Sequence, residues 1–306
     1  MHVTKKNEED AMDFLKERPT DKPFCLTVAF FATHAEDQDP DEPWKPQNES
    51  MLLYLDDTIP MSPSATKEAW MSMPPFFDEG NEGRLRWHNR YDSPERFQDV
   101  MKNYYRMATE VDSSSQAIVQ ELENQGILNE TLIIFTTDNG FFHAEHGLSD
   151  KFYPHQESIR VPLIIRDPRM SDEFIGTTND DFTLSIDLAP TIVSAAGITV
   201  PDRMQGRDIS VLYRKDGAKE LKASPWRVEF FYEFPEVGSP PENICPSEAL
   251  VRKDFKFVNW TYHMQEQLFD LQNDPFELND IIDSPEHQEL LTRMRMRLSV
   301  LRDAAK

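Results

Sequence analysis

The sequence predicts an α/β fold, in which a mixed sheet flanked by helices is followed by a small antiparallel sheet with a covering helix. Two observations lead to this prediction. A long helical pattern at residues 93–125 leads directly into an apolar, β-branched run at residues 132–137, a helix-to-strand step that is typical of α/β proteins. From about residue 215 onward, short strand-like runs separated by turns take over.

Length and composition limit the interpretation. A chain of 306 residues, 39% of them hydrophobic, can bury a core and can hold one large domain or two. We expect a boundary near residue 215, with an α/β domain at residues 1–215 and a small α+β subdomain at residues 216–306. The formal net charge of −23 argues against general nucleic-acid binding, because a phosphate backbone is bound by basic patches.

The sequence contains few features that indicate membrane insertion, secretion or disulfide bonding. No run approaches 18 apolar residues, so the sequence predicts no transmembrane helix, and the first residues contain no apolar segment of a signal peptide. The two cysteines, Cys25 and Cys245, make no disulfide framework, and a single bridge between them is left open. The sequence does not indicate an oligomeric state.

The first hundred residues predict one helix and one strand before a long irregular stretch. Residues 8–18 have apolar side chains on one helical face, and Pro19 ends that helix. The dense apolar run at residues 24–32 predicts a buried strand that leads to His34. Residues 36–97 are rich in proline, and a long irregular stretch in a compact domain is usually functional or disordered.

A basic and aromatic cluster lies within this irregular stretch of a strongly acidic chain. Its basic members are Arg84, Arg86, His88 and Arg90. Two interpretations are open. The side chains can form salt bridges to nearby acids, as surface charges commonly do. Alternatively, they recognise an anionic or sugar substrate, since guanidinium groups bind sulfate and carboxylate and aromatic rings stack on sugar faces.

The longest helix is expected at residues 93–125. Ser93 is a good N-cap, Pro94 follows it at the first helical position, and Gly126 is placed to end the helix. The strand at 132–137 follows. A further strand is expected at residues 161–165, a short one at 182–186, and a helix at 187–196 in which Asp187 acts as a cap rather than as a catalyst.

The last ninety residues predict the small antiparallel sheet and its helix. Alternating apolar residues bounded by turn residues indicate strands, and a closing amphipathic segment indicates the covering helix. The four strands are expected at residues 227–232, 249–252, 256–260 and 267–270, and the helix at 284–302.

Chemistry-bearing residues follow the strand at 132–137. That strand ends in Asp138-Asn139-Gly140, and ligands in α/β sheets collect beyond the carboxyl ends of strands. Carboxylate and amide oxygens together suit a hard cation such as Ca²⁺ or Mg²⁺. The triplet alone is a common turn signal. The next residues, however, add Glu145, His146 and Lys151, and this density of polar groups indicates an active-site loop.

The whole stretch resembles the sulfatase family of the alkaline-phosphatase-like superfamily. Three further segments are similar to segments of that family, one near the N-terminus and two in the second half of the chain. The segments that carry the resemblance are Thr137-Asp138-Asn139-Gly140, Ala144-Glu145-His146-Gly147-Leu148, Asp150-Lys151, Glu157-Ser158-Ile159-Arg160-Val161-Pro162-Leu163, residues 21–34, residues 201–208 and residues 269–277.

The resemblance implies an alkaline-phosphatase-like fold and a set of roles. Asp138 and Asn139 match metal ligands, for which Ca²⁺ is the expected ion. Lys151 matches the lysine that contacts sulfate and the leaving oxygen, and His34 matches a sulfate-contacting histidine. Glu145 and His146 match an element that shapes the site, although Ala144 stands where the family usually has glycine. No firm motif carries over Arg84, Arg86, His88 and Arg90, which remain candidates for substrate recognition.

The resemblance covers only the C-terminal half to two-thirds of a sulfatase. Family members begin with a strand that ends in an Asp pair, followed by a Cys-x-Pro-x-Arg motif whose cysteine becomes the formylglycine nucleophile. Neither Cys25 nor Cys245 is followed by this pattern, so the sequence contains no nucleophile. We therefore expect 1–215 to be the later part of a sulfatase catalytic domain with its N-terminal part missing, and the chain alone to have little activity.

The predicted activity is sulfate-ester hydrolysis on a sulfated small molecule or carbohydrate. One alternative is a phosphatase, phosphodiesterase or phosphonate hydrolase of the same superfamily, although Asn139 stands where many two-metal members carry histidine. The other is a non-catalytic glycan-binding pseudoenzyme. By resemblance to the family, the protein is expected to be secreted, periplasmic or lysosome-like.

Overall fold

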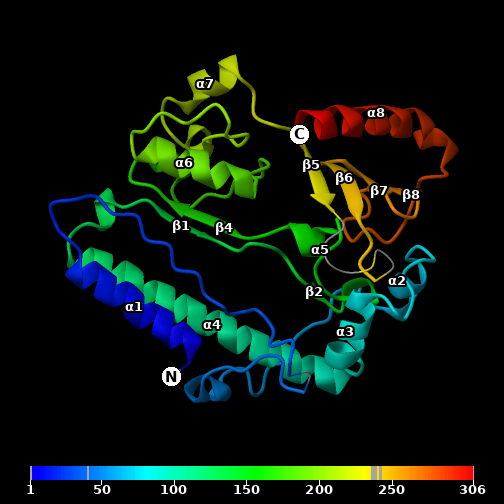
Figure 1. The fold of residues 1–306 in the computed structure, drawn as a ribbon, viewed down its shortest axis with the longest axis horizontal. Helices are drawn as coiled ribbons and strands as arrows, with labels where there is room; N and C mark the ends of the chain where they lie inside the picture. Colours follow the sequence, from blue (N-terminus) through cyan, green and yellow to red (C-terminus); the bar gives the residue numbers. More distant parts are fainter. Residues whose placement is uncertain (1, 40, 236–239, 241–242, 306) are drawn as a thin grey trace.

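The computed structural model describes residues 2–39, 41–235, 240 and 243–305. Three regions lie side by side in Figure 1: a long helical pair along one side, a central two-stranded ribbon with short helices above it, and a C-terminal sheet with one long helix. The mixture of helices with several small sheets confirms the α/β class.

The helical pair consists of α1 (Val3–Glu17) and α4 (Pro94–Asn124). The Ser93 hydroxyl caps α4 by accepting the backbone N–H of Arg96 at 3.2 Å, as its sequence predicts. Helix α1 begins five residues earlier than expected, because the His2 ring caps it by accepting the N–H of Thr4 at 3.3 Å. Gln125 joins the two helices by donating to the carbonyl of Leu15 at 3.0 Å.

The strand expected at residues 24–32 is wrong. The segment is extended, and its side chains alternate between half-buried and exposed. In the described part of the chain, however, no backbone ladder pairs it with a neighbour. A β-strand is defined by such a ladder, so an apolar run alone does not make one. In Figure 1 this dark blue segment, which follows α1, runs between α4 and the central ribbon.

The central ribbon is made of β1 (Ile133–Thr136) and β4 (Leu163–Arg166), which pair antiparallel with Ile133 opposite Arg166. Both strands were expected, with slightly wider bounds. Residues 182–186 do not form the expected strand. A 3-10 turn at Ser185–Asp187 leads instead into α6 (Leu188–Ala195), since the buried Asp187 carboxylate accepts the N–H of Leu184 at 2.7 Å.

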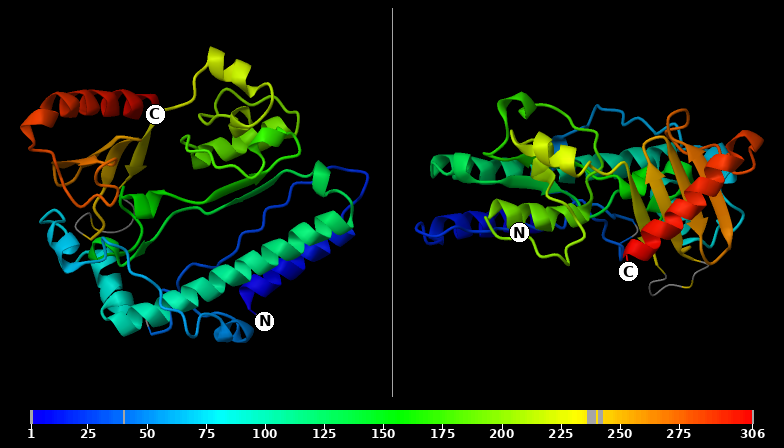
Figure 2. Two further views of the ribbon diagram at one scale, coloured as in Figure 1. Left: turned by 180° about the vertical axis from the view of Figure 1, so that it is seen from behind. Right: turned by 90° about the horizontal axis from the view of Figure 1, so that it is seen from above.

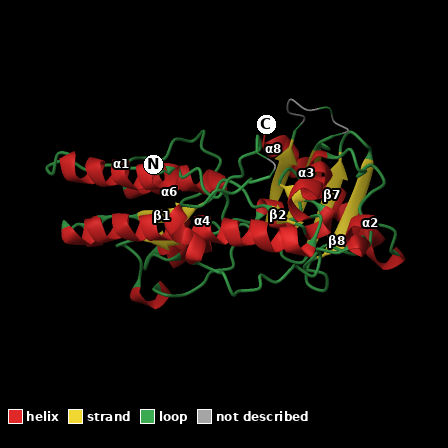
Figure 3. Ribbon diagram, turned by 90° about the horizontal axis from the view of Figure 1, so that it is seen from below, coloured by secondary structure: helices red, strands yellow, loops and turns green. Residues whose placement is uncertain are grey.

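The stretch at 36–97 contains more helix than its prolines suggest. It forms α2 (Lys67–Met71) and α3 (Glu82–Tyr91), so the basic cluster lies on a helix rather than a loop. The fully buried Asn81 side chain starts α3 by accepting the N–H of Gly83 at 3.0 Å. Figures 1 and 3 place α3 beside β2 (Phe142–His143), which pairs with β3 (Ser149–Asp150).

The C-terminal sheet has the order β5-β6-β7-β8 and is antiparallel throughout, as expected. Helix α8 (Gln288–Ala305) covers one face with Leu291, Met294 and Leu298, and the other face packs on Phe142 and Tyr153. Figure 2 shows α8 lying diagonally across the strands. The strands are β5 (Glu229–Phe234), β6 (Ser247–Arg252), β7 (Phe255–Trp260) and β8 (Gln265–Asp270).

Two further expectations concern the whole chain. Cys25 is an exposed free thiol and Cys245 is fully buried, so no bridge joins them. Across the described ranges, no helix has the length and apolar character needed to cross a membrane. The boundary at residue 215 stays a prediction. A short helix, α7 (Gly217–Ala223), lies just beyond it and packs against a 3-10 turn at Ile209–Leu212.

Candidate active site

The Asp138-Asn139-Gly140 turn follows β1, and its backbone packs closely against helix α5 (Gln156–Ile159). The Gly140 N–H donates to the carbonyl of Ser158 in α5 at 2.8 Å. A Cβ added at Gly140 would lie 2.1 Å from the Glu157 carbonyl oxygen, so only glycine allows this approach. The turn therefore presents Asp138 and Asn139 from a fixed backbone at the end of a strand.

The oxygens of this turn are suited to a cation. One Asp138 oxygen accepts the Asn139 N–H at 2.9 Å, and the carboxylate is exposed. The Asn139 amide nitrogen donates to the Gly140 carbonyl at 2.7 Å, so its side-chain oxygen faces away from that bond. One carboxylate and one amide oxygen fit the chemistry of a hard cation. Over the ranges that the structure describes, no group of three or more His, Cys, Asp or Glu side chains completes such a site.

Lys151 lies on a backbone with unusual conformations on either side. Asp150 has a φ of 81° and Phe152 a φ of 91°, values that residues other than glycine seldom adopt and that cluster at functional sites. The Lys151 side chain is half-buried, and its ammonium group has no hydrogen bond or ion pair with any described residue. A cation without an internal partner is available for an anionic ligand.

Glu145 and His146 lie in the loop between β2 and β3. The Glu145 carboxylate accepts the N–H of His143, and burial raises the Glu145 pKa. His146 is 1% exposed, and its ring lies 4.7 Å from that of His155. Burial, with His155 adding to it, lowers the pKa of His146 to about 3, so the ring is neutral. His146 is therefore buried within the loop, and the site-shaping role of both residues stays a prediction.

His34 is exposed at the end of the extended segment. Its Nδ1 lies 2.7 Å from the carbonyl oxygen of Ala35, and its ring packs against Phe31 at 5.4 Å. Ala35 is buried in the same apolar cluster as Ala144 and Tyr91. The structure therefore anchors the His34 segment against the loop that carries Glu145 and His146.

The four basic residues of α3 are engaged with acidic side chains of the protein itself. Arg84 bonds Glu79 at 3.0 Å and His88 bonds the same carboxylate at 2.6 Å. Arg84 also donates to the Gly147 carbonyl at 3.1 Å and stacks on Trp70 and Trp87. The basic side chains thus form the salt bridges that the first interpretation predicts. Substrate recognition by these side chains stays a prediction.

Two acidic residues that were not among the predicted site residues organise this area. Asp37 accepts from Arg90 at 2.7 Å and from Arg86 at 3.3 Å. Asp150 accepts from the same two arginines, from Arg90 at 3.3 Å. Asp37 lies three residues after His34 and Asp150 directly precedes Lys151. Sequence adjacency to predicted site residues was the only available signal, and the contact itself depends on the fold.

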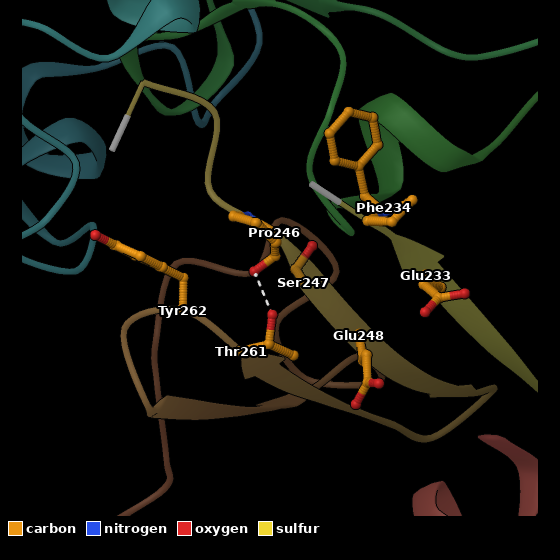
Figure 4. Close-up of a pocket in the computed structure, with 8 residues that line it drawn as sticks. Glu233, Phe234, Pro246, Ser247, Glu248, Thr261 and Tyr262 are labelled. Atoms are coloured by element: carbon orange, nitrogen blue, oxygen red, sulfur yellow. Dashed lines mark hydrogen bonds between the residues drawn. The ribbon is translucent and has the colours of Figure 1, made fainter. Parts of the chain in front are cut away.

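A depression of about 370 Å³ lies elsewhere, at the ends of β5, β6 and β7 (Figure 4). Its walls carry the carboxylates of Glu233 and Glu248 together with Tyr262, and Thr261 donates to the Pro246 carbonyl at 3.4 Å. None of the predicted site residues lines it. Two carboxylates disfavour an anionic substrate, so we do not assign the active site to this depression.

Comparison with protein families agrees with the residue pattern. The family model described as Sulfatase matches residues 3–198, which is more than half of the chain. The model described as N-sulphoglucosamine sulphohydrolase, C-terminal, matches residues 144–304.

Two curated proteins illustrate the similarity. An N-acetylglucosamine-6-O-sulfatase of Bacteroides thetaiotaomicron is 31% identical over 194 residues, covering 63% of this chain and 34% of that protein. An arylsulfatase of Clostridium perfringens is 27% identical over 300 residues, and the match covers 96% of this chain and 56% of that protein. The chain therefore spans between about a third and just over half of the length of these relatives.

Solved structures share the fold. One, in complex with its substrate D-glucosamine-2-N,6-O-disulfate, has a TM-score of 0.79 at 21% identity and covers 97% of this chain and 69% of that one. A phosphonate monoester hydrolase of Agrobacterium radiobacter has a TM-score of 0.77 at 24% identity, and the match covers 98% of this chain and 60% of that one. At this identity the likeness concerns the alkaline-phosphatase-like fold alone. Together with the matched family models and the Asp138 to Lys151 pattern, it means that this chain belongs to the sulfatase family.

Proposed function

We propose that this chain provides part of the active site of a sulfatase that hydrolyses sulfate esters of carbohydrates. The observation that carries the proposal is the loop that begins with the locked Asp138-Asn139 turn and returns to Lys151, whose ammonium group is unpaired within the described residues. It supplies two oxygen donors for a cation and one positive charge for a sulfate. His34, anchored against the same loop, provides a further contact to the sulfate.

Local positive charge is essential in this protein. Its formal net charge of −23 repels a sulfate at long range, although ions screen that repulsion beyond about 10 Å. At contact distance Lys151 and a cation outweigh it, since Coulomb attraction grows as separation falls. Asp138 and Asn139 would hold the divalent cation, which when bound stabilises the negative charge that builds up on the sulfate oxygens.

The sulfated-carbohydrate assignment rests on similarity. The relative with 31% identity is an N-acetylglucosamine-6-O-sulfatase, and the solved neighbour binds a sulfated glucosamine. Asn139 in place of histidine favours a sulfatase over the phosphatase and phosphonate hydrolase alternatives. One relative is described as an extracellular sulfatase homolog of Drosophila melanogaster, which supports a secreted, periplasmic or lysosome-like location. A glycan-binding pseudoenzyme would share the fold without turnover.

The test is turnover by the protein as its host produces it. N-acetylglucosamine-6-sulfate should be hydrolysed at least tenfold faster than the matching phosphate ester, and Lys151→Ala should lower kcat about 10²–10³-fold, as loss of a transition-state contact does. Faster hydrolysis of the phosphate ester would move the protein to the phosphatase alternative. Binding of the sulfated sugar without any turnover would favour the pseudoenzyme.

The 306-residue chain by itself is expected to behave differently. Because its sequence contains no nucleophile motif, we predict that the purified chain turns over an aryl sulfate no faster than its Lys151→Ala variant does. Turnover clearly above that control would contradict the assignment of the missing nucleophile.

A further inference from the structure

Four charged side chains form a closed cluster between three segments that are distant in sequence. We call Asp37, Arg86, Arg90 and Asp150 the charge quartet. Each arginine bonds both carboxylates: Arg90 reaches Asp37 at 2.7 Å and Asp150 at 3.3 Å, and Arg86 reaches Asp37 at 3.3 Å and also contacts Asp150. Arg90 adds a bond to the Ser149 hydroxyl at 3.2 Å.

From this arrangement we infer that Arg86 and Arg90 are positioning residues, which clamp the segment of His34 to the segment of Lys151 across α3. The inference rests on the proposed function for the roles of His34 and Lys151. It replaces direct substrate recognition by these two arginines with an action through Asp37 and Asp150.

Burial makes the quartet specific. Arg90 is 4% exposed and Asp150 is 2% exposed, so neither can exchange its partner for water. A guanidinium group has donors in a fixed fork, which lets one arginine hold two carboxylates at once. Burial opposes the charge on Arg86, but the nearby Asp150, Glu82 and Asp37 outweigh it and raise the Arg86 pKa. The Arg86 guanidinium therefore stays positively charged.

The backbone next to Lys151 explains why a clamp is needed. Asp150 and Phe152 both have positive φ angles, and such conformations persist only where the surroundings hold them. The quartet holds Asp150 by its carboxylate. On the other side, the Tyr232 hydroxyl of β5 donates to the Phe152 carbonyl at 3.0 Å. Lys151 lies between these two fixed points.

The Asp37 end of the quartet acts on the His34 segment. The Glu36 N–H donates to the Pro43 carbonyl at 2.7 Å, and Ala35 is buried, so the chain between His34 and Asp37 has little freedom. Removing the hydrogen bonds from Arg86 and Arg90 to Asp37 should make the His34 segment more mobile. Removing Arg90 should loosen both segments, because Arg90 holds both carboxylates.

Hydrogen exchange measured by mass spectrometry on the 306-residue chain tests the clamp without requiring activity. In Arg90→Gln, amides in peptides covering 32–38 and 147–153 should exchange at least tenfold faster than in the wild type. In Asp37→Asn, only the first peptide should change. The matched control is Glu79→Gln, which removes the exposed carboxylate paired with Arg84 and His88 on the same helix and should change neither peptide.

Unchanged exchange of both peptides in a folded Arg90→Gln variant would overturn the clamp. If that variant does not fold, Asp37→Asn decides, because Asp37 is exposed and its replacement leaves the buried charges paired. Faster exchange at 32–38 alone then supports the inference, and no change there, or an equal change in both peptides, overturns it.

Kinetics of the protein as its host produces it separate positioning from substrate recognition. Positioning predicts that Arg86→Gln lowers kcat at least tenfold while KM changes less than threefold. Direct recognition predicts the reverse, a KM raised at least tenfold with exchange unaltered, and would overturn the inference. Absence of turnover in the wild type would instead overturn the proposed function, while the exchange result would still decide the clamp.

Discussion

Two glycines show how single positions build the candidate site. Gly140 lets the Asp138 turn approach α5, and Gly147, with φ of 68°, lets the following loop approach Trp70, whose Cβ would lie 2.8 Å from an added methyl group. Ala144 has φ of 82°, a conformation that glycine adopts without penalty. Alanine at position 144 therefore adds local backbone strain that glycine would avoid.

We predict that Gly140→Ala lowers the free energy of unfolding by about 2–3 kcal/mol, because the new methyl group collides with backbone carbonyls that cannot move as side chains can. Urea denaturation followed by tryptophan fluorescence measures this. The control is Gly80→Ala, whose Cβ would meet only the flexible Asp78 side chain at 3.2 Å and should cost less than about 0.5 kcal/mol. Equal losses in the two variants would show that the turn does not depend on the close approach.

The proposed metal ligands, Asp138 and Asn139, lead to a second prediction at the scale of residues. With two oxygen donors, the 306-residue chain should bind Ca²⁺ with a dissociation constant no tighter than about 10⁻⁴ M, since tighter sites have more ligands. Isothermal titration calorimetry measures this, and Asp138→Asn should remove the remaining heat. Nanomolar affinity would mean that further ligands in this chain complete the site.

At the scale of elements, the C-terminal sheet supports the site through α5. Lys256, fully buried in β7, donates to the Pro154 carbonyl at 2.7 Å and pairs with Glu277 at 2.6 Å. The other Glu277 oxygen accepts the Gln156 N–H, the first of α5, at 2.8 Å. Helix α5 in turn holds Gly140. The Asp138-Asn139-Gly140 turn is therefore fastened to a sheet that begins about ninety residues later in the chain.

Breaking this buried pair should be costly. We predict that Lys256→Met destabilises the protein by about 3–5 kcal/mol, because the Glu277 charge stays buried without its partner. The double variant Lys256→Met with Glu277→Gln should recover part of the loss. Arg293→Met, which breaks the exposed pair with Glu289, is the control and should cost less than about 1 kcal/mol in the same urea denaturation. A loss as small as in the control would contradict the role of the pair.

At the scale of the whole molecule, buried histidines tie stability to pH. Burial lowers the pKa of His155 to about 3, and nearby Lys256 adds to the shift. His146 and His143 shift to about 3 as well, also mainly through burial. In the unfolded chain each ring takes up a proton near pH 6.5, so acidification favours unfolding. Burial raises the Glu157 pKa to about 7, and protonation of that group in the folded state opposes the trend in part.

We therefore predict that stability falls between pH 7 and pH 5, and that His155→Phe reduces the fall by about 2 kcal/mol, since one ring no longer takes up a proton on unfolding. Phenylalanine preserves the ring shape among Phe142, His146 and Phe269. Urea denaturation at both pH values measures the difference. An unchanged fall in the variant would mean that His155 does not contribute.

The molecule also exposes apolar surface around the central ribbon. Ile164 in β4 is 64% exposed, Ile186 is 50% exposed and Phe31, in the unpaired extended segment, is 48% exposed. Strands β1 and β4 pair only with each other among the described residues. Uncovered strand edges and apolar faces favour association with other chains.

The sequence by itself determined the elements whose signals are local. The cap at Ser93, the alternating runs of the C-terminal sheet and the polar residues after β1 depend on neighbours a few positions away, so the helix α4, strands β5 to β8 and the Asp138 to Lys151 loop could be predicted. The resemblance carried by that loop also predicted the family.

Only the tertiary structure decided what depends on distant partners. Among the described residues, no backbone ladder joins residues 24–32 to a strand, and no local sequence pattern reports that. The local sequence around Arg86 and Arg90 is the same whether these side chains bind a substrate or carboxylates of the protein. The fold brings Asp37 and Asp150 within hydrogen-bond distance of both arginines. Hydrogen bonds and ion pairs act over a few ångströms, and the fold alone brings residues more than a hundred positions apart to that distance.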